Sequence, residues 1–513
     1  MMARWAERVS RVRVVGTGVM GRGIAQLAAS GGLTVELADV RMDAIVAAVQ
    51  RLGEVFARQV AKGRMSAADA EAAMDRLIPV GDPLTPLQDC DLVIEAVRED
   101  LGAKRDLFAA LEKAAPATTV LATNTSSLSV TAIGAALDDP SRLVGLHFFN
   151  PVPLMRLVEV VPGARTAPGL VDDLADLVRR LGHEPVRAPD TPGFLVNHAG
   201  RGLVTEALQV LSEGVAEPAD VDRIARDVLG LKMGPFELLD LTGLDVSHPV
   251  LESIWAGFYG EPRLRPSALL RARAEAGLLG RKTGEGFYVY RDGTKDEPAE
   301  REAPKAEARP VWLAEDVRET LGALLGTSGV TVEQGDAPSA GAVALVAPWG
   351  RSALDAARDA GLPVERTLGV DPLGGFFARV VLAVHPGVDP AAGRAAWAAL
   401  AGTGRAVTVV RDAPAPVAQR LLASIVNVGC GIAEQRLASP ADIDTGVRLG
   451  LGYPRGPLEW GDHAGAGTVL EVLRGLAEAT GDPRYRPSRW LAERAGLGLP
   501  LTGPGTSPAS LLD

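Results

Sequence analysis

The chain has few residues of the kinds that build disulfide frameworks, metal centres or nucleic-acid surfaces. Its 513 residues include two cysteines and six histidines, with no CxxC motif and no cluster of cysteine and histidine. Disulfide scaffolds and structural zinc sites rely on such clusters, so we expect neither, and we predict no metal. Acidic residues outnumber basic ones and give a formal net charge of −11. This lack of a basic excess argues against non-specific binding to nucleic acid.

Long apolar runs are lacking as well. No uncharged apolar stretch reaches the length of about 18 residues that a membrane-spanning helix needs. Residues 1–13 carry charges and have no apolar core of the kind found in secretory signals. We therefore expect a cytoplasmic protein with no membrane partner. A chain of this length exceeds one ordinary hydrophobic core, so we also expect several domains.

Strand-like and helical patterns alternate over the first part of the chain. Residues 11–15 form a β-branched run that leads into glycines and an alanine-rich helical stretch, and residues 33–40 read as the next strand. Residues 42–80 read as two helices, the second of which opens at Ser66 with Asp69 three places on, as in a capping box. Further strand-like runs follow at 91–97, 119–123, 143–149 and 157–161. The alternation predicts an α/β domain of Rossmann type, with a largely parallel, doubly wound sheet and an inserted helical hairpin.

The second half of the chain repeats part of the first. A shift of 222 residues carries Pro-Ala-Asp at 218–220 onto Pro-Ala-Asp at 440–442, and Gly-Pro at 234–235 onto Gly-Pro at 456–457. So many matches at one offset indicate that a helical domain is duplicated, together with part of a Rossmann-like half that has no glycine-rich turn.

These patterns divide the chain into five segments. Between the two halves lies a stretch that is almost entirely charged, small or proline, which is typical of a mobile linker. The predicted segments are a Rossmann domain at 1–189, an all-α domain at 190–290, the charged linker at 291–309, a degenerate Rossmann-like segment at 310–410 and a second all-α domain at 411–513.

The motif GTGVMG follows the first predicted strand and opens the next helix. Its glycines allow a tight turn and let backbone N–H groups approach a pyrophosphate at the positive end of the helix. Asp39 ends the second predicted strand, where a carboxylate accepts hydrogen bonds from ribose hydroxyls and repels a 2′-phosphate. The predicted cofactor residues are Gly16, Gly18, Val19, Met20, Gly21 and Asp39. The pattern favours NAD over NADP, although the nearby Arg41 weakens that preference. The alternative is a glycine turn in a domain that binds no nucleotide.

Polar residues also stand at the ends of the later predicted strands, where open α/β sheets bind ligands. His147 lies between Leu146 and two phenylalanines, and Glu159 is flanked by valines. An inward-facing carboxylate needs a partner, and a histidine is a plausible one. Such a carboxylate fixes the imidazole tautomer and stabilises the imidazolium formed after proton abstraction, so the two residues predict a general-base pair. The alternative for a single histidine on a strand is a hydrogen-bonded core residue.

Seven motifs occur in a fixed order over residues 11–290: GTGVMGRGIA, NTSSL, GLHFFNP, LVEVV, DTPGFLVN, GPFELLD and GRKTGEGFY. Together they resemble the 3-hydroxyacyl-CoA dehydrogenases, particularly the 3-hydroxybutyryl-CoA type, here with a duplicated C-terminal helical domain. The resemblance implies an NAD-dependent, reversible oxidation of (S)-3-hydroxyacyl-CoA to 3-oxoacyl-CoA, in fatty-acid or related acyl-CoA catabolism.

The resemblance also implies roles for individual residues. His147 would be the general base and Glu159 its partner, Ser126 would bind the substrate hydroxyl beside the nicotinamide, and Asn197 would contact the substrate side of the pocket. Further cofactor contacts would come from Glu99, Lys104, Asn150 and Lys282. The helical hairpin at 42–80 would help to hold the coenzyme A part of the substrate.

The second copy has lost these catalytic residues. At the shift of 222, Glu159 corresponds to Val381 and Asn197 to Gln419, and the segment that matches GLHFFNP begins at 369–371 without a histidine. We therefore expect no second enzyme in this half of the chain.

What the second copy keeps is the helical scaffold, which forms the dimer interface in dehydrogenases that resemble this one. We therefore expect residues 411–500 to pack on residues 190–290 as an internal pseudo-dimer, because a two-fold contact is self-complementary and survives duplication. Homodimerisation through other surfaces stays open.

Two other functions compete with this one. Another Rossmann dehydrogenase could act on a small hydroxy acid or on carnitine. A catalytically silent binding or structural protein would have lost at least one of the four predicted catalytic residues, and all four are present. A bifunctional hydratase–dehydrogenase is not expected, because the second half repeats the first and adds no different fold.

Overall fold

The computed structural model describes residues 5–511, which form two compact units. One contains the chain up to His198 together with Arg436–Leu451, and the other contains Ala199–Gln435 and the chain from Gly452 onward. Residues 1–4, which begin the first predicted segment, and residues 512–513, which end the last one, lie outside the described residues. Within residues 5–511, no helix combines the length and the apolar character that crossing a membrane requires.

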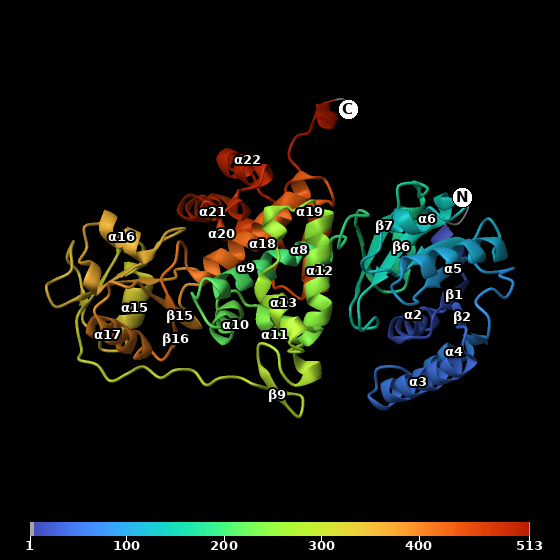
Figure 1. Cartoon of the computed structure of the whole chain (residues 1–513), viewed down its shortest axis with the longest axis horizontal. Coiled ribbons are helices and arrows are strands. Elements are labelled where there is room, and N and C mark those ends of the chain that lie inside the picture. Colours follow the sequence, from blue (N-terminus) through green and yellow to red (C-terminus); the bar gives the residue numbers. More distant parts are fainter. Residues whose placement is uncertain (1–4, 512–513) are drawn as a thin grey trace. The chain divides into compact units, whose positions relative to one another are not determined.

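The first unit is built on an eight-stranded sheet with the order β3-β2-β1-β4-β5-β6-β7-β8 (Figure 1). Its strands are β1 (Arg11–Val15), β2 (Thr34–Ala38), β3 (Leu77–Val80), β4 (Leu92–Glu95), β5 (Val120–Thr123), β6 (Leu143–Phe148), β7 (Leu157–Pro162) and β8 (Glu184–Arg187). All neighbouring strands are parallel except β6 and β7. The predicted, largely parallel Rossmann-type sheet is therefore confirmed.

Helices surround this sheet. They are α1 (Trp5–Arg8), α2 (Val19–Ser30), α3 (Met42–Ala61), α4 (Ala67–Asp75), α5 (Leu101–Ala114), α6 (Val130–Gly134), α7 (Leu170–Arg180) and α8 (Val196–Ala199). The predicted helical hairpin is α3 and α4, and the predicted cap is present, since Ser66 Oγ accepts a hydrogen bond from Asp69 N at 3.0 Å. Strand β3, directly after the hairpin, was not expected, because it is four residues long and contains Pro79. An edge strand tolerates proline, and β3 is at the edge.

The second unit contains helices from both copies of the helical domain. The first copy provides α9 (Arg201–Ser212), α10 (Pro218–Asp227), α11 (Pro235–Thr242), α12 (Leu244–Gly257) and α13 (Ala268–Glu275). The second provides α18 (Val417–Glu434), α20 (Pro457–Ala464), α21 (Ala466–Thr480) and α22 (Arg489–Leu497). Its remaining helix, α19 (Pro440–Leu451), belongs to the first unit.

The two copies pack directly on each other through α9 and α18, which lie side by side in Figure 1. Their backbones approach closely, because a Cβ on Gly202 would lie 2.8 Å from Ile425 Cα. Beside this contact, the buried Arg420 pairs with Glu206 at 2.6 Å and with Glu213 at 2.5 Å. Helices of the two copies are thus in direct contact within this unit.

A second, six-stranded sheet precedes the second helical copy, with the order β12-β11-β13-β14-β15-β16. Its strands are β11 (Val311–Leu313), β12 (Val332–Glu333), β13 (Val343–Val346), β14 (Thr367–Val370), β15 (Arg379–Val384) and β16 (Ala406–Arg411), and its helices are α14 (Glu315–Arg318), α15 (Thr320–Gly326), α16 (Ala353–Asp359) and α17 (Pro390–Ala401). The antiparallel pair β14 and β15 stands where β6 and β7 stand in the first sheet. The order β13-β14-β15-β16 therefore matches β5-β6-β7-β8, and the second sheet has two strands fewer than the first.

The charged segment 291–309 is more ordered than its composition suggests. Its strand β10 (Thr294–Asp296) pairs with β9 (Val289–Arg291). Glu297 bonds to Arg226 of α10 at 2.7 Å, and Glu300 bonds to Arg379 of β15 at 2.7 Å. Composition alone predicts a mobile linker, because it does not show that arginines on neighbouring elements provide partners for these glutamates.

Candidate active site

The glycine turn between β1 and α2 closes tightly on itself. Gly16 has a φ of +100°, and a Cβ there would lie 2.6 Å from the carbonyl oxygen of Ala96. A Cβ on Gly21 would lie 1.8 Å from the carbonyl oxygen of Gly16, so only glycine fits at both positions. Around Gly18 the space is open, since its Cβ position has no neighbour within 4 Å. The turn therefore exposes its backbone at the start of the 12-residue helix α2, a place suited to a pyrophosphate.

Asp39 stands beside this turn, one residue after β2. Its carboxylate accepts hydrogen bonds from Thr17 N at 3.0 Å, from Thr17 Oγ1 at 2.9 Å and from Arg41 N at 3.1 Å. Partial burial acts to raise the pKa of Asp39, but these hydrogen bonds outweigh it and hold the pKa below its ordinary value. A carboxylate offers about four acceptor positions, so the ionised, half-buried group retains capacity for a ribose hydroxyl. The turn and Asp39 together fit the adenosine diphosphate part of NAD.

Gly21→Ala is expected to weaken NADH binding by about 10–100-fold. The added methyl group would overlap the Gly16 carbonyl, and such overpacking costs about 1–3 kcal/mol. Titration of NADH fluorescence with the purified chain measures the effect. Gly53→Ala in α3 is the control, because its Cβ would find only ordinary contacts at 3.6 Å and beyond. Unchanged affinity in Gly21→Ala would contradict the assignment of this turn.

Glu99, which follows β4, organises the loop that carries Ser126. Its Oε1 accepts hydrogen bonds from Thr125 Oγ1 at 2.7 Å and from the backbone N–H groups of Ser126 and Ser127, both at 2.9 Å. Burial acts to raise the pKa of Glu99, but the Thr125 hydroxyl, the Lys104 ammonium and these N–H groups lower it to about 2. The carboxylate is therefore ionised at neutral pH and holds the loop with the exposed Ser126 in place.

Lys104 lies behind Glu99. It is 1% exposed, and its Nζ contacts Glu95 Oε1 at 2.6 Å and Glu99 Oε2 at 3.2 Å. Glu95 in turn accepts a hydrogen bond from Thr123 Oγ1 at 2.7 Å. In this arrangement Lys104 orients Glu99, and its predicted contact with the cofactor stays a prediction. Glu95 was not predicted from the sequence, although an acidic residue at the end of an apolar strand is a usable signal.

His147 and Glu159 face each other across the antiparallel strands β6 and β7. His147 Nδ1 lies 2.6 Å from Glu159 Oε2, and both residues are buried. Since a carboxylate only accepts hydrogen bonds, Nδ1 carries the proton, and Nε2 is the nitrogen left for proton transfer. The imidazole also packs against two aromatic rings, with its centroid 4.5 Å from that of Phe149 and 5.7 Å from that of Phe194. The predicted pairing is thus present as a histidine–carboxylate dyad.

A short backbone segment holds Glu159 from the other side. Its Oε1 accepts hydrogen bonds from Leu195 N at 2.9 Å and Val196 N at 2.8 Å. A buried carboxylate needs such partners to offset its loss of solvation. The segment begins with Phe194, whose φ is +48°, and it leads into α8. Phe194 was not predicted from the sequence, because nothing local indicates that this residue reaches a histidine on β6.

The remaining predicted residues fall in different places. Ser126 follows β5, and His147 lies near the end of the neighbouring strand β6 at the same edge of the sheet. Asn150 is exposed just beyond β6. Asn197 comes directly after the residues that bind Glu159. Lys282 lies in the second unit, where it pairs with Asp245. The roles of these four residues toward cofactor and substrate stay predictions.

The equivalent edge of the second sheet carries different chemistry. Asp371 stands where the first sheet has His147, opposite Val381, whose carbonyl oxygen accepts the Asp371 N–H at 3.2 Å. Burial raises the pKa of Asp371 to about 6. Gln419 donates to Asp371 Oδ1 at 3.2 Å and accepts from Gly350 N at 3.0 Å, which closes the loop over this edge. This edge of the described sheet therefore holds no histidine–carboxylate dyad.

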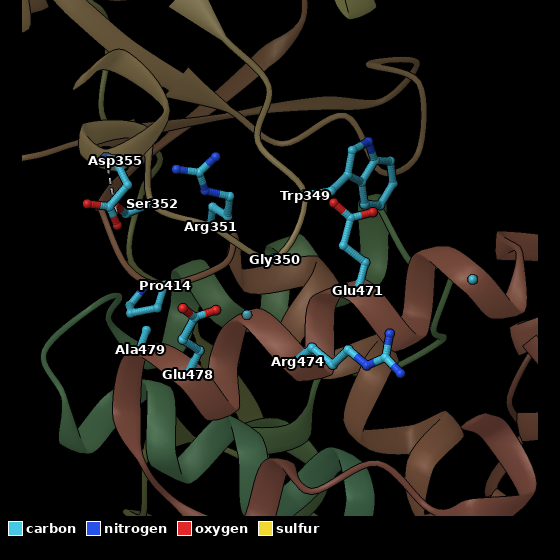
Figure 2. A pocket seen from close by; sticks show the side chains of 12 residues that line it. Trp349, Gly350, Arg351, Ser352, Asp355, Pro414, Glu471, Arg474, Glu478 and Ala479 are labelled. Atoms are coloured by element: carbon cyan, nitrogen blue, oxygen red, sulfur yellow. Dashed lines mark hydrogen bonds between the residues drawn. The ribbon is translucent and has the colours of Figure 1, made fainter. Parts of the chain in front are cut away.

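A cavity of about 590 Å³ lies beside the same loop of the second unit. Its lining includes Trp349 and Arg351 on the loop and Glu471, Arg474 and Glu478 on α21, and Figure 2 shows the Glu471 carboxylate beside Trp349. A Cβ on Gly475 of α21 would lie 1.9 Å from the carbonyl oxygen of Gly350. The loop is thus packed directly on the helix, and the cavity beside it is lined by charges of both signs.

Known proteins resemble this chain in sequence. The family model for the NAD-binding domain of 3-hydroxyacyl-CoA dehydrogenase matches residues 11–191, and the model for the C-terminal domain matches residues 193–290 and again 417–500. A protein of Escherichia coli K12 named 3-hydroxyadipyl-CoA dehydrogenase is 39% identical over 490 residues, which covers 95% of this chain and 98% of that protein. A probable 3-hydroxybutyryl-CoA dehydrogenase of Bacillus subtilis is 38% identical over 286 residues, covering 56% of this chain and 99% of that protein.

A solved structure matches over nearly the whole chain. The crystal structure of 3-hydroxybutyryl-CoA dehydrogenase from Escherichia coli K12 has a TM-score of 0.83 at 38% identity and covers 96% of this chain and 99% of that one. The chain described here therefore belongs to the 3-hydroxyacyl-CoA dehydrogenase family, and it is an NAD-dependent oxidoreductase that oxidises 3-hydroxyacyl-CoA.

Proposed function

We propose that the chain converts (S)-3-hydroxyacyl-CoA reversibly to 3-oxoacyl-CoA in acyl-CoA catabolism, with His147 as the general base and short dicarboxylic acyl groups among its substrates. The assignment of His147 as the general base rests on the buried contact of 2.6 Å between His147 Nδ1 and Glu159 Oε2. The substrate class is supported by the full-length relative named 3-hydroxyadipyl-CoA dehydrogenase.

In this mechanism His147 Nε2 removes the proton of the C3 hydroxyl group. NAD⁺, when bound at the glycine turn, supplies the acceptor for the hydride that leaves C3. Glu159 stabilises the imidazolium that forms, because its carboxylate already accepts the Nδ1–H. General-base catalysis of this kind contributes about 10²–10⁴-fold to the rate.

Ser126 and Asn197 complete the proposed catalytic set. Ser126 binds the substrate hydroxyl, and Glu99 fixes its loop through bonds to the backbone N–H groups. Asn197 contacts the substrate beside Glu159, since it follows the residues whose N–H groups hold that carboxylate. Holding the reacting groups in this geometry removes an entropic part of the barrier. Asn150 and Lys282 are retained as further cofactor contacts.

We also infer that the second half of the chain takes the place of a partner subunit. The Bacillus subtilis relative has no counterpart for about half of this chain, since 99% of its length matches 56% of this chain. In this chain α18 packs on α9 within one compact unit, and Arg263 of the first copy donates to the Arg486 carbonyl of the second at 3.0 Å. The proposal includes a cytoplasmic location, because two cysteines in 513 residues are too few for the disulfide framework of a secreted protein. Cell fractionation tests that location.

A substrate comparison tests the proposed reaction. Purified chain with NAD⁺ is expected to form NADH with (S)-3-hydroxyadipyl-CoA and (S)-3-hydroxybutyryl-CoA, with the higher kcat/KM for the former, and to show no turnover of free 3-hydroxybutyrate or carnitine. Absorbance of NADH gives the rate. Turnover of the free hydroxy acid or of carnitine alone would establish the competing dehydrogenase function. NAD binding without turnover of any 3-hydroxyacyl-CoA would contradict the proposed reaction and support only the nucleotide site.

A further inference from the structure

One helix of the second copy belongs to the catalytic unit. Helix α19 is far in sequence from the Rossmann domain, yet it forms one compact unit with residues up to His198. There it packs on strands β7 and β8, the first of which carries Glu159. The other helices of its copy belong to the second unit.

Two glycines allow α19 to approach this part of the unit closely. A Cβ on Gly450 would lie 2.7 Å from Val196 Cγ1 and 2.9 Å from Leu157 Cδ2. A Cβ on Gly446 would lie 3.3 Å from Leu195 Cδ2 and 3.5 Å from Val196 Cγ2. The methyl groups of a valine sit on Cβ and have little freedom to move away. Any side chain at 450 would therefore displace either α19 or the backbone at Val196.

The residues under these glycines are the ones that hold the dyad. The N–H groups of Leu195 and Val196 are the donors to Glu159 Oε1. Leu157 lies two residues before Glu159 on β7 and so faces the same side of the sheet. The path from α19 to His147 therefore has two steps: packing on Leu195 and Val196, and then the hydrogen bonds of Glu159.

The equivalent helix of the first copy lacks both glycines. At the shift of 222 residues, Gly446 corresponds to Ile224 and Gly450 to Val228, in and directly after α10. In the first copy the glycine is on the opposing segment instead. A Cβ on Gly374, in the loop between β14 and β15, would lie 2.9 Å from Val228 Cγ1. Of the two equivalent helices, only the one that packs on the catalytic unit thus has glycine at these two positions.

We propose that α19 is a positioning element of the active site, and that Gly446 and Gly450 let the second copy set the place of Glu159 and thereby of the His147 imidazole. Neither glycine touches substrate or cofactor. The inference rests on the proposed function only where kcat is measured. The geometry of the His147–Glu159 pair can be measured without substrate.

The test compares Gly450→Ala with Gly496→Ala in the full chain. Both glycines are the penultimate residues of their helices, but Gly496 has no neighbour within 4 Å of its Cβ position. Alanine favours a helix over glycine, so a helix without a close contact at either position would give two neutral or stabilised variants. A packing contact with no effect on the dyad would lower the stability of Gly450→Ala but leave kcat and the His147 environment unchanged. We expect Gly450→Ala to lower kcat by about 10-fold or more, since misplacement by about 1 Å costs on that order. The KM for NAD⁺ should stay unchanged, Gly446→Ala should show a smaller loss, and Gly496→Ala should match the wild type.

A spectroscopic reading separates this inference from the proposed reaction. The His147 Nδ1–H, bonded at 2.6 Å, should give a far-downfield proton resonance that His147→Ala removes. We expect Gly450→Ala to shift or lose this resonance, and the double variant Gly450→Ala/Val196→Ala to restore it together with kcat, because the smaller side chain makes room for the new Cβ. An unchanged resonance and full kcat in Gly450→Ala would overturn the inference, as would a failure of the double variant to restore either. If the wild type turned over no hydroxyacyl-CoA, the proposed function would fail, while the resonance would still decide this inference.

Discussion

Replacing His147 with alanine is expected to lower kcat for 3-hydroxyacyl-CoA oxidation by about 10²–10⁴-fold, the usual contribution of a general base. The variant loses the nitrogen that accepts the hydroxyl proton, and it leaves Glu159 with only its backbone partners, Leu195 and Val196. The glycine turn and Asp39 are untouched, so NADH affinity should stay the same. Steady-state NADH absorbance measures the first quantity, and fluorescence titration measures the second.

His463→Ala is the control for this prediction. His463 is exposed on α20 in the second unit, and its replacement should leave kcat unchanged. A His147→Ala variant with at least half of the wild-type kcat would remove His147 from the mechanism. A variant that also lost NADH affinity would indicate that the histidine supports the fold of the sheet edge rather than proton transfer.

Arg420→Ala is expected to lower the free energy of unfolding by about 3–5 kcal/mol, because it leaves a buried charge without its partner. Arg420 and Glu206 are each 1% exposed, and they join α18 of the second copy to α9 of the first. Tyr485 also donates to Glu206 at 3.1 Å, but a neutral hydroxyl does not replace a guanidinium. The midpoint of urea unfolding, followed by circular dichroism, reports the loss.

The pH dependence of this variant gives an independent check. Burial raises the pKa of Glu206, and the Arg420 guanidinium opposes that shift in the wild type. Without Arg420 the folded chain binds a proton at Glu206 more readily than the unfolded chain does. Stability therefore rises as the pH falls, and the deficit of Arg420→Ala should be smaller at about pH 5 than at about pH 7.5.

Two further variants define what would contradict this prediction. Arg489→Ala removes an arginine whose side chain is 74% exposed, so its effect should stay within about 0.5 kcal/mol. The double variant Arg420→Met/Glu206→Gln removes both buried charges and should recover most of the loss. Equal effects of Arg420→Ala and Arg489→Ala would show that the contact between the two copies does not depend on this ion pair.

Local features of the sequence predicted much of the fold and part of the site. The glycine turn, Asp39 and the cap of α4 at Ser66 depend on residues within about 20 positions of one another, so they can be recognised without knowing the tertiary structure. The alternation of strands and helices predicted the Rossmann sheet for the same reason. Strand β3 was not predicted, because four residues that include a proline show too little periodicity.

The sequence predicted the histidine–glutamate pair only in part. The sequence indicated two buried polar residues 12 positions apart, but only the antiparallel register of β6 and β7 places them opposite each other. A shift of that register by one residue would turn one of the two side chains to the other face of the sheet. Glu95 and Phe194 joined the site through contacts that no local pattern shows.

The sequence by itself determined the dinucleotide turn, the strand and helix types, the duplication of the helical domain and the loss of catalytic residues from the second copy. Each of these is encoded in periodicity, in turn residues or in the match between two stretches of the same chain. Only the tertiary structure decided that α19 packs on the strand bearing Glu159, that Arg420 is buried against Glu206, and that Glu297 and Glu300 bind arginines outside their own segment. Such contacts join residues about 70 to 300 positions apart, and their partners are selected by packing and by the burial of charge, which local sequence patterns do not contain.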